Sequence, residues 1–509
     1  MSSAQDTPES LAVPPADKSG EGAPDVLDTS AAGGMIIRGG ALRLASYVTI
    51  VVLSLIPAVL LTRYLGAARF GRYTTVISLV TVVALVTDTG MSNLGIREYA
   101  VLEGAERDAV MRNLLGLRVV LTLGGVLLAT LFAIFAGYST ALLAGTIAAS
   151  LATVALVLQH TLSIPLAAEL RIGAMSAIEV ARQAMTVVGI VALVAIGAGV
   201  FPLLAVLLVV YLLLVPVTGT LVRWRISLRM GLRPTQWVAL LRPTVSFSLA
   251  TAVGAIYVYT AQIITSLATT PHQNGLFALS FRIFIITVAA PGLLVSGAVP
   301  LLARAARDDR ERLAYAMQRI FEVSLILGIG TALGMYAGAP FIVKVLAGPK
   351  LHEYTGSIDV LRILGFAMIA SFLIAGWGFA LLSIKSYRAL LMINAAALLV
   401  SCTLTPILAS AFGATGAAFA VLGGEATLAC GYVIALNSNH RDLRPHVGIV
   451  PRILLSAVPA VALVAVLDLP SLPLTVIALL LYGVLIILTR AVPSELIEMI
   501  PRRRSQVAP

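Results

Sequence analysis

The residues that could bind a charged ligand are ionisable side chains inside long apolar runs. A charge buried in lipid costs about 2.5–3.5 kcal/mol or more at the middle of a helix, so each one indicates a partner, a cavity or a function. Arginine can pair bidentately with phosphate, whereas a buried carboxylate can take up a proton or a cation. The candidates are Arg43, Asp88, Arg118, Glu179, Arg182, Arg282, Glu322, Arg362 and Glu425.

Three of these side chains lie too deep in their runs to face lipid. Asp88 is about 21 Å along its run by the helical rise, Arg282 is about 9 Å along its own, and Glu425 is in the middle of a run. We expect all three to face a bundle interior or a cavity, where a structural ion pair and a ligand-binding role remain open alternatives. The simpler interpretation of four others is that they reach the membrane surface: Arg118, Glu179, Arg182 and Glu322.

Enzyme chemistry and bound metals are not indicated. Cys402 and Cys430 fall inside apolar runs and are interpreted as small buried hydrophobes, and the five histidines show no spacing typical of metal ligands. We therefore expect no metal, no cofactor and no catalytic site. A membrane glycosyltransferase is the enzymatic rival, but the longest predicted outside loop, near 343–359, is too short for such an enzyme's active site.

The elements that position these residues are predicted to be membrane helices. Hydrophobic residues make up 59% of the 509-residue chain and charged residues 12%, against about 25% charged in soluble domains. Runs that stay apolar for about 20 residues match helical spans, not barrel strands. We expect an all-α polytopic protein with about 14 spans, near 41–62, 74–95, 114–136, 139–160, 177–199, 202–222, 244–266, 276–298, 320–342, 360–383, 389–410, 414–436, 452–468 and 471–489.

The loop charges predict an orientation. With an even number of spans, 28 of the 35 Lys and Arg residues fall on the face that carries both termini. The positive-inside rule then makes both termini cytoplasmic. We expect the membrane to be the bacterial cytoplasmic (inner) membrane. The net charge of +11 is thus explained by topology and not by nucleic-acid binding. Residues 1–36 are acidic and lack apolar runs, which predicts a disordered cytoplasmic tail and not a signal peptide.

A faint internal repeat predicts how the spans are grouped. RFGRYTTVISLVTVVA (69–84) resembles QNGLFALSFRIFIITVA (273–289), and Gly71 and Gly275 are 204 residues apart, about six spans. Repeats of this kind are common in transporters. We therefore expect two six-helix bundles and two extra helices, divided as 37–240, 241–440 and 441–490, followed by a cytoplasmic tail at 491–509.

Three segments carry a specific resemblance: TRYLGAARFGRY (62–73), TDTGMSNLGIREYA (87–100), and the stretch from NGLFALSFRI to PLLARAA (274–306). Together they resemble the Wzx-type flippases of the multidrug/oligosaccharidyl-lipid/polysaccharide (MOP) exporter superfamily, over about residues 40–440. One departure is that AIYVYTAQII (255–264) carries Gln262 where relatives often have an acid.

The resemblance implies a flippase that moves a polyprenyl-diphosphate-linked oligosaccharide, or a related glycolipid, across the cytoplasmic membrane for cell-surface polysaccharide biosynthesis. Its two bundles would form a V around a cavity that opens alternately to each side. Arg43, Arg97 and Arg282 lie on helices that line the portal in relatives, and we expect them to bind the diphosphate together.

Asp88 and Glu425 are the candidates for ion coupling. The alternative for Asp88 is a fixed salt bridge with Arg97 or Arg43. Expected partners are the lipid-linked glycan, membrane lipids, and a polysaccharide polymerase or glycosyltransferases. The alternative functions are a cation-coupled multidrug antiporter of the same superfamily, a lipid II flippase and, less favoured, a membrane glycosyltransferase.

Overall fold

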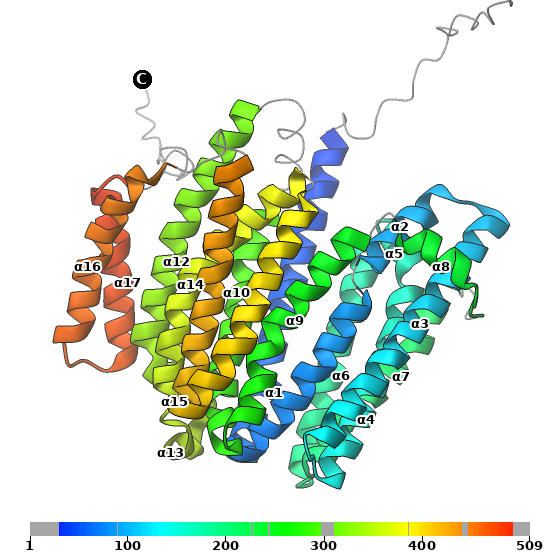
Figure 1. Cartoon of the computed structure of the whole chain (residues 1–509), viewed down its shortest axis with the longest axis horizontal. Coiled ribbons are helices and arrows are strands. Elements are labelled where there is room, and N and C mark those ends of the chain that lie inside the picture. The colour runs from blue at the N-terminus through cyan, green and yellow to red at the C-terminus, as the bar shows by residue number, and fades with distance from the viewer. Residues whose placement is uncertain are drawn as a thin grey trace, which may run out of the picture.

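The structure is a computed structural model that describes residues 30–491, except 89, 224, 227–228, 243–244, 297–309, 385 and 440–445. The predicted C-terminal tail and almost all of the predicted N-terminal tail therefore lie outside the described residues. Within the described ranges every regular element is helical, and the long helices run side by side as in a membrane domain (Figure 1). The chain is a multi-pass membrane protein.

The first half of the chain supplies seven helices and the second half the remainder, with α8 (Pro234–Leu241) between them. The first-half helices are α1 (Ser30–Asp88), α2 (Met91–Val101), α3 (Gly104–Phe135), α4 (Thr140–Leu162), α5 (Ile164–Ala168), α6 (Ile172–Ala195) and α7 (Val200–Leu221). The later helices are α9 (Val245–Ala268), α10 (Pro271–Ser296), α12 (Arg310–Ala347), α13 (Leu351–Tyr354), α14 (Ser357–Ser383), α15 (Tyr387–Asn439), α16 (Val450–Val466) and α17 (Ser471–Leu488).

Two of the long helices are hairpins. The described part holds twelve helices that are long and apolar enough to cross a membrane. Among them, α1 reverses at Gly66 (φ 73°) and α15 at Gly413 (φ 61°), a backbone region that glycine enters at little cost. Each hairpin counts as two spans, so the described chain crosses fourteen times, as predicted. Both turns lie at the lower end of the molecule in Figure 1.

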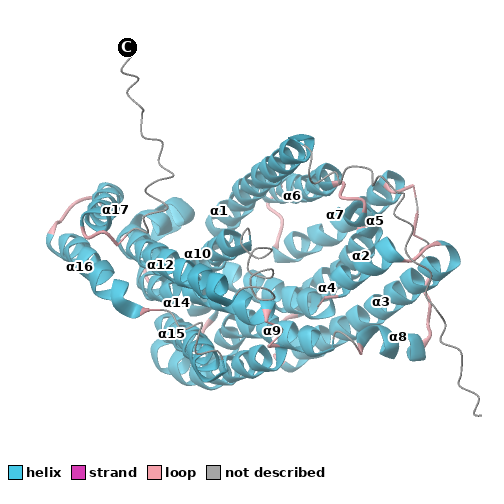
Figure 2. Ribbon diagram, turned by 90° about the horizontal axis from the view of Figure 1, so that it is seen from above, coloured by secondary structure: helices cyan, strands magenta, loops and turns pink. Residues whose placement is uncertain are grey.

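The helices pack as two groups with a pair at one edge. Within the first half α4 contacts both α3 and α7, and within the second half α14 contacts both α12 and α15. Seen from above, α16 and α17 lie at the far edge, where α17 packs on α12 (Figure 2). This packing is compatible with two bundles plus two extra helices.

Three local expectations need correction. The predicted span 74–95 ends at Asp88, and α2 starts only at Met91, after Gly90 with φ 73°. The stretch 343–359, predicted to be an outside loop, is largely helical, with the end of α12, a 3₁₀ turn and α13. Cys402 and Cys430 are exposed and not buried, because their faces of α15 point out of the helix packing.

Candidate functional site

The two halves meet in direct backbone contact at the end where α1 reverses. A Cβ atom built on Gly71 of α1 would lie 2.7 Å from the amide nitrogen of Gly275 of α10. A Cβ atom on Gly275 would lie 1.9 Å from the carbonyl oxygen of Ala67. Any side chain at Gly275 would therefore push the helices apart. The two glycines that the sequence repeat aligned are thus in contact in space.

A chain of buried amides crosses this contact. Gln262 of α9 donates from Nε2 to Oδ1 of Asn274 at 2.7 Å. Asn274 donates from Nδ2 to the carbonyl oxygen of Gly71 at 3.0 Å and to Oγ1 of Thr75 at 2.9 Å. All three side chains are buried. In the sequence, Gln262 stood out only because relatives often have an acid there. In the structure it holds the side chain of Asn274, which links the second half to the first.

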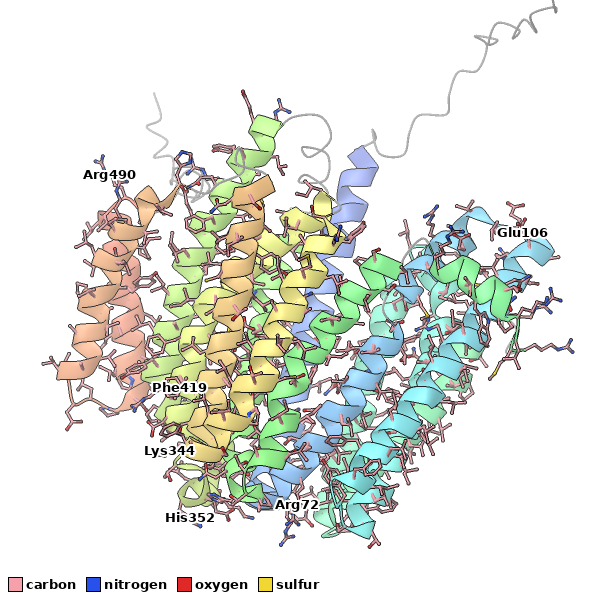
Figure 3. All side chains as sticks on the ribbon, in the orientation of Figure 1. Arg72, Glu106, Lys344, His352, Phe419 and Arg490 are labelled. Carbon is pink, nitrogen blue, oxygen red and sulfur yellow. The ribbon has the colours of Figure 1, made fainter. Side chains whose placement is uncertain are left out.

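The turn at Gly66 is capped from the second half by the end of α12, the 3₁₀ turn that follows it and α13. Arg63 donates from Nη2 to the carbonyl oxygen of Val345 at 2.6 Å, and Lys350 donates from Nζ to that of Tyr64 at 3.2 Å. A carboxylate oxygen of Glu353 accepts the backbone N–H of Ala67 at 3.0 Å. Figure 3 shows Arg72 and His352 at this same end of the molecule. The two halves are closed against each other here.

Arg282 lies on α10, the helix that carries Gly275, and is farther from the closed end. It is eleven residues into α10, about 16 Å from the closed end by the helical rise, which is near the middle of a bilayer core of about 30 Å. The side chain is partly buried, and its electrostatic neighbours are Tyr73 of α1 and Tyr259 of α9. Among the described residues no carboxylate pairs with it, and its Nε has no hydrogen-bond partner. A guanidinium in this state is open to an anionic ligand.

Arg97, another of the predicted diphosphate ligands, does not join Arg282 in this structure. Arg97 is exposed on α2, which starts beyond Asp88. Asp88 is itself fifteen residues along α1 from Tyr73, about 22 Å by the helical rise. The side chain of Arg43 lies outside the described residues. The predicted common cavity for the three arginines stays a prediction.

Asp88 is paired, but not with a predicted partner. Its carboxylate accepts a hydrogen bond from Nη2 of Arg118 of α3 and another from Oγ of Ser92 at 2.7 Å. The alternative that Asp88 pairs with Arg97 was wrong, and so was the expectation that Arg118 would reach the surface. A contact with Arg43 stays a prediction, because that side chain lies outside the described residues. Arg118 has no exposed surface, and the Asp88 carboxylate supplies the counter-charge for its buried guanidinium.

Further charged groups of the first half lie close to this pair. Glu179 and Arg182 of α6 form an ion pair, with Nε of Arg182 at 3.0 Å from Oε2 of Glu179. His160 of α4 lies within electrostatic reach of this pair and of Asp88–Arg118. Glu179 and Arg182 were expected to reach the membrane surface. The structure shows that they pair with each other on one helix face while both side chains stay partly exposed.

Glu425 has only neutral partners among the described residues. It is 8% exposed and lies on the second segment of α15. Tyr257 of α9 donates to its Oε1 at 3.0 Å, and Ser371 of α14 donates to its Oε2 at 2.6 Å. The carboxylate borders a cavity of about 590 Å³ that is lined mostly by apolar side chains of α9, α14 and α15, with Asn394 as a further polar group. Glu425 can therefore exchange a proton or cation without first breaking an ion pair.

Comparison with known proteins identifies the family. Residues 60–356, more than half of the chain, match the family described as polysaccharide biosynthesis protein. No curated protein sequence matches the chain.

Solved structures identify the fold. The chain is similar to the lipid II flippase MurJ in an inward closed conformation, with 14% identity and a TM-score of 0.74 over 90% of this chain and 100% of that one. It is also similar to an inward-facing multidrug resistance MATE family transporter of the MOP superfamily, with 15% identity and a TM-score of 0.61 over 79% of this chain and 99% of that one. A MOP superfamily transporter from Pyrococcus furiosus gives 13% identity and a TM-score of 0.56 over 78% and 94%.

These structural similarities establish a fold shared with transport proteins, none of which is named as an enzyme. The fourteen helical spans and the two groups in contact at one end agree with that fold. The chain has the MOP superfamily fold and belongs to the polysaccharide biosynthesis protein family.

Proposed function

We propose that the protein is a flippase that carries a polyprenyl-diphosphate-linked oligosaccharide, or a related glycolipid, from the cytoplasmic to the outer leaflet of the inner membrane. The observation that carries this proposal is Arg282, a guanidinium near mid-membrane with no carboxylate partner among the described residues. Such a group suits an anion, and its planar donors match the oxygens of a diphosphate. Because the family is described as taking part in polysaccharide biosynthesis, we infer that the substrate carries a glycan.

The route across the membrane follows from the closed end. We assign the end with the Gly66 and Gly413 turns to the outside, because the loop charges put both termini in the cytoplasm. The contact of Gly71 with Gly275 then shuts the outer end, and the substrate enters from the cytoplasm. Transport requires that this contact opens after the cytoplasmic end has closed. The sugar head crosses between the halves while the lipid tail stays in the bilayer.

Glu425 is the favoured coupling group. Both carboxylate oxygens accept hydrogen bonds from neutral hydroxyls, so uptake of a proton or cation changes the local charge directly. Asp88 is disfavoured because the buried guanidinium of Arg118 holds its carboxylate. We propose that Asp88 has a structural role in the first half and that coupling depends on Glu425.

A cation-coupled multidrug antiporter is the second candidate, favoured by the cavity beside Glu425. An apolar cavity of about 590 Å³ with one carboxylate at its wall suits a lipophilic organic cation. Arg282 argues against this function, since a cationic substrate that passed between the halves would meet a positive charge with no carboxylate partner among the described residues. A lipid II flippase shares the fold, and the choice between it and an oligosaccharide flippase depends on the sugar.

Reconstitution separates these functions. Purified protein in proteoliposomes would be given fluorescent polyprenyl-diphosphate oligosaccharides, lipid II, or the lipophilic cation ethidium. The proposal expects the first class of lipid to change leaflet, measured by protection from a membrane-impermeant quencher, and no ethidium transport. Transport of ethidium without lipid movement would favour the antiporter, and movement of lipid II alone would favour the lipid II flippase.

A further inference from the structure

A polar pocket in the first half has no role so far. It lies between α1, α4 and α6 and has a volume of about 310 Å³, near the lower limit of small-molecule sites. Polar side chains are costly in membrane helices unless they are paired or serve a function. The pocket nevertheless gathers six of them on three helices: Ser46, Gln159, His160, Ser163, Ser176 and Glu179.

The charges around this pocket are already neutralised. Glu179, the acid in its wall, is held by Arg182. The second ion pair near His160 is Asp88 with Arg118. Among the described residues that line the pocket there is no arginine or lysine, and the described residues hold no group of acids, histidines and cysteines that could bind a metal ion. The lining therefore favours a neutral polar ligand over a phosphate or a metal ion.

The hydrogen-bonding groups left open in the wall include both donors and acceptors. Gln159 donates from Nε2 to Oγ of Ser163 at 3.2 Å, and this hydroxyl donates to the Gln159 carbonyl oxygen at 2.9 Å, so these two side chains hold each other in place. The His160 ring and the Ser176 hydroxyl form no hydrogen bond with other described residues. A neutral imidazole offers one donor and one acceptor, and a hydroxyl offers both. Adjacent sugar hydroxyls offer the same mixture.

The pocket also lies at the end from which the substrate would enter. It is formed where α4 ends and α6 begins, at the end of the molecule opposite the Gly66 turn (Figure 1). That end is the cytoplasmic one in the topology proposed above. Arg282 belongs to the second half and lies near mid-membrane, so the pocket and Arg282 are separate sites.

We propose that this pocket binds the hydroxyl groups of a sugar unit of the lipid-linked glycan while Arg282 takes the diphosphate. The inference rests on the proposed flippase function and adds to it the location of sugar recognition. A pocket that hydrogen-bonds hydroxyls discriminates against a ligand that lacks them, because its own polar groups are then left unpaired. The first half would thereby distinguish a glycan-bearing lipid from the bare lipid diphosphate.

Affinity measurements on the full chain in nanodiscs test this. The probes are sugar-free polyprenyl diphosphate and polyprenyl diphosphates that carry a hexose, an N-acetylhexosamine or a uronic acid. The proposal expects at least one sugar-bearing lipid to bind wild type about tenfold more tightly than the sugar-free lipid. His160→Phe and Ser176→Ala should each remove most of this difference and leave the affinity for the sugar-free lipid unchanged. Ser410→Ala, on the exposed face of α15, is the matched control and should bind as wild type.

Each other outcome has a definite meaning. Equal weakening of both lipid classes by the two variants would place the diphosphate or the lipid tail in the pocket and overturn the inference. Unchanged affinities in both variants would also overturn it, and the flippase function would stand if wild type still bound and flipped the lipids. If wild type bound none of the probes, the flippase proposal would fall as well. Should His160→Phe not fold, Ser176→Ala decides the result.

Discussion

Gly71 of α1 and Gly275 of α10 occupy matching places in the two halves of the chain and pack against each other, with a built Cβ of Gly71 only 2.7 Å from the Gly275 nitrogen. The amides of Gln262 and Asn274 reinforce the contact from the second half. An alternating-access transporter needs a seal that is tight but separable. Two glycines and a few neutral hydrogen bonds form the buried part of this contact. The charged side chains that also cross it, Arg63, Lys350 and Glu353, are exposed or only partly buried, so their separation requires little transfer of buried charge to water.

Gly275→Val should destabilise the closed outer end. The added Cβ would lie 1.9 Å from the Ala67 carbonyl oxygen, and a backbone atom cannot move aside cheaply. Overpacking of this kind costs about 1–3 kcal/mol or more. Gly483→Val on α17 is the control, because no atom lies within 4 Å of the Cβ position there. Thermal unfolding in detergent should show a lower midpoint for Gly275→Val only. Equal midpoints would contradict the claim that Gly275 packs tightly against α1.

The Asp88–Arg118 pair should behave as a structural unit. Asp88→Asn leaves the Arg118 guanidinium buried without its counter-charge, and removing one partner of a buried pair costs about 3–5 kcal/mol. We expect the low end of that range, since the Asp88 side chain is 36% exposed. The double variant Asp88→Asn/Arg118→Met should regain much of the loss in unfolding midpoint. If Asp88→Asn were fully stable but transported without response to an ion gradient, Asp88 would be the coupling acid instead.

Glu425→Gln should uncouple transport while the fold is kept. Glutamine retains an acceptor for the hydroxyls of Tyr257 and Ser371 but cannot gain or lose a proton. The measurement is the rate of lipid transport in proteoliposomes with and without a proton or sodium gradient. Glu322→Gln is a matched control, because Glu322 is also 8% exposed but is paired with Arg319. Gradient dependence that persists in Glu425→Gln would place coupling elsewhere.

The orientation in the membrane can be tested at Arg72 and Glu106, which lie at opposite ends of the molecule (Figure 3). In a background that lacks Cys402 and Cys430, Arg72→Cys should react with an impermeant maleimide in intact cells. Glu106→Cys should react only after the membrane is opened. The reverse pattern would mean that both termini lie outside the cytoplasm. Reaction of both positions in intact cells would mean that the helix between them does not cross the membrane, which would contradict the fourteen spans.

The length of the continuous apolar runs predicted the spans, because a segment in lipid must satisfy its own backbone and about 20 apolar residues cross the bilayer as a helix. The repeat predicted that Gly71 and Gly275 correspond, but a sequence pattern does not show that they touch. The polar partners were harder to predict because they depend on how helices rotate against each other. Arg118 is 30 residues from Asp88, and Tyr257 is 168 residues from Glu425. Asn274 was part of the recognised motif, yet only the packing shows that it joins Gln262 to α1.

The most direct test of the account is the rate at which Arg282 variants move a polyprenyl-diphosphate oligosaccharide between leaflets in proteoliposomes. Arg282→Ala should abolish movement at unchanged protein level, and Arg282→Lys should retain part of it, since lysine keeps the charge but not the planar donors. Arg362→Ala, which removes a partly exposed ion pair with Asp359, should flip lipid as wild type does. Wild-type flipping by Arg282→Ala would contradict the claim that this arginine binds the diphosphate.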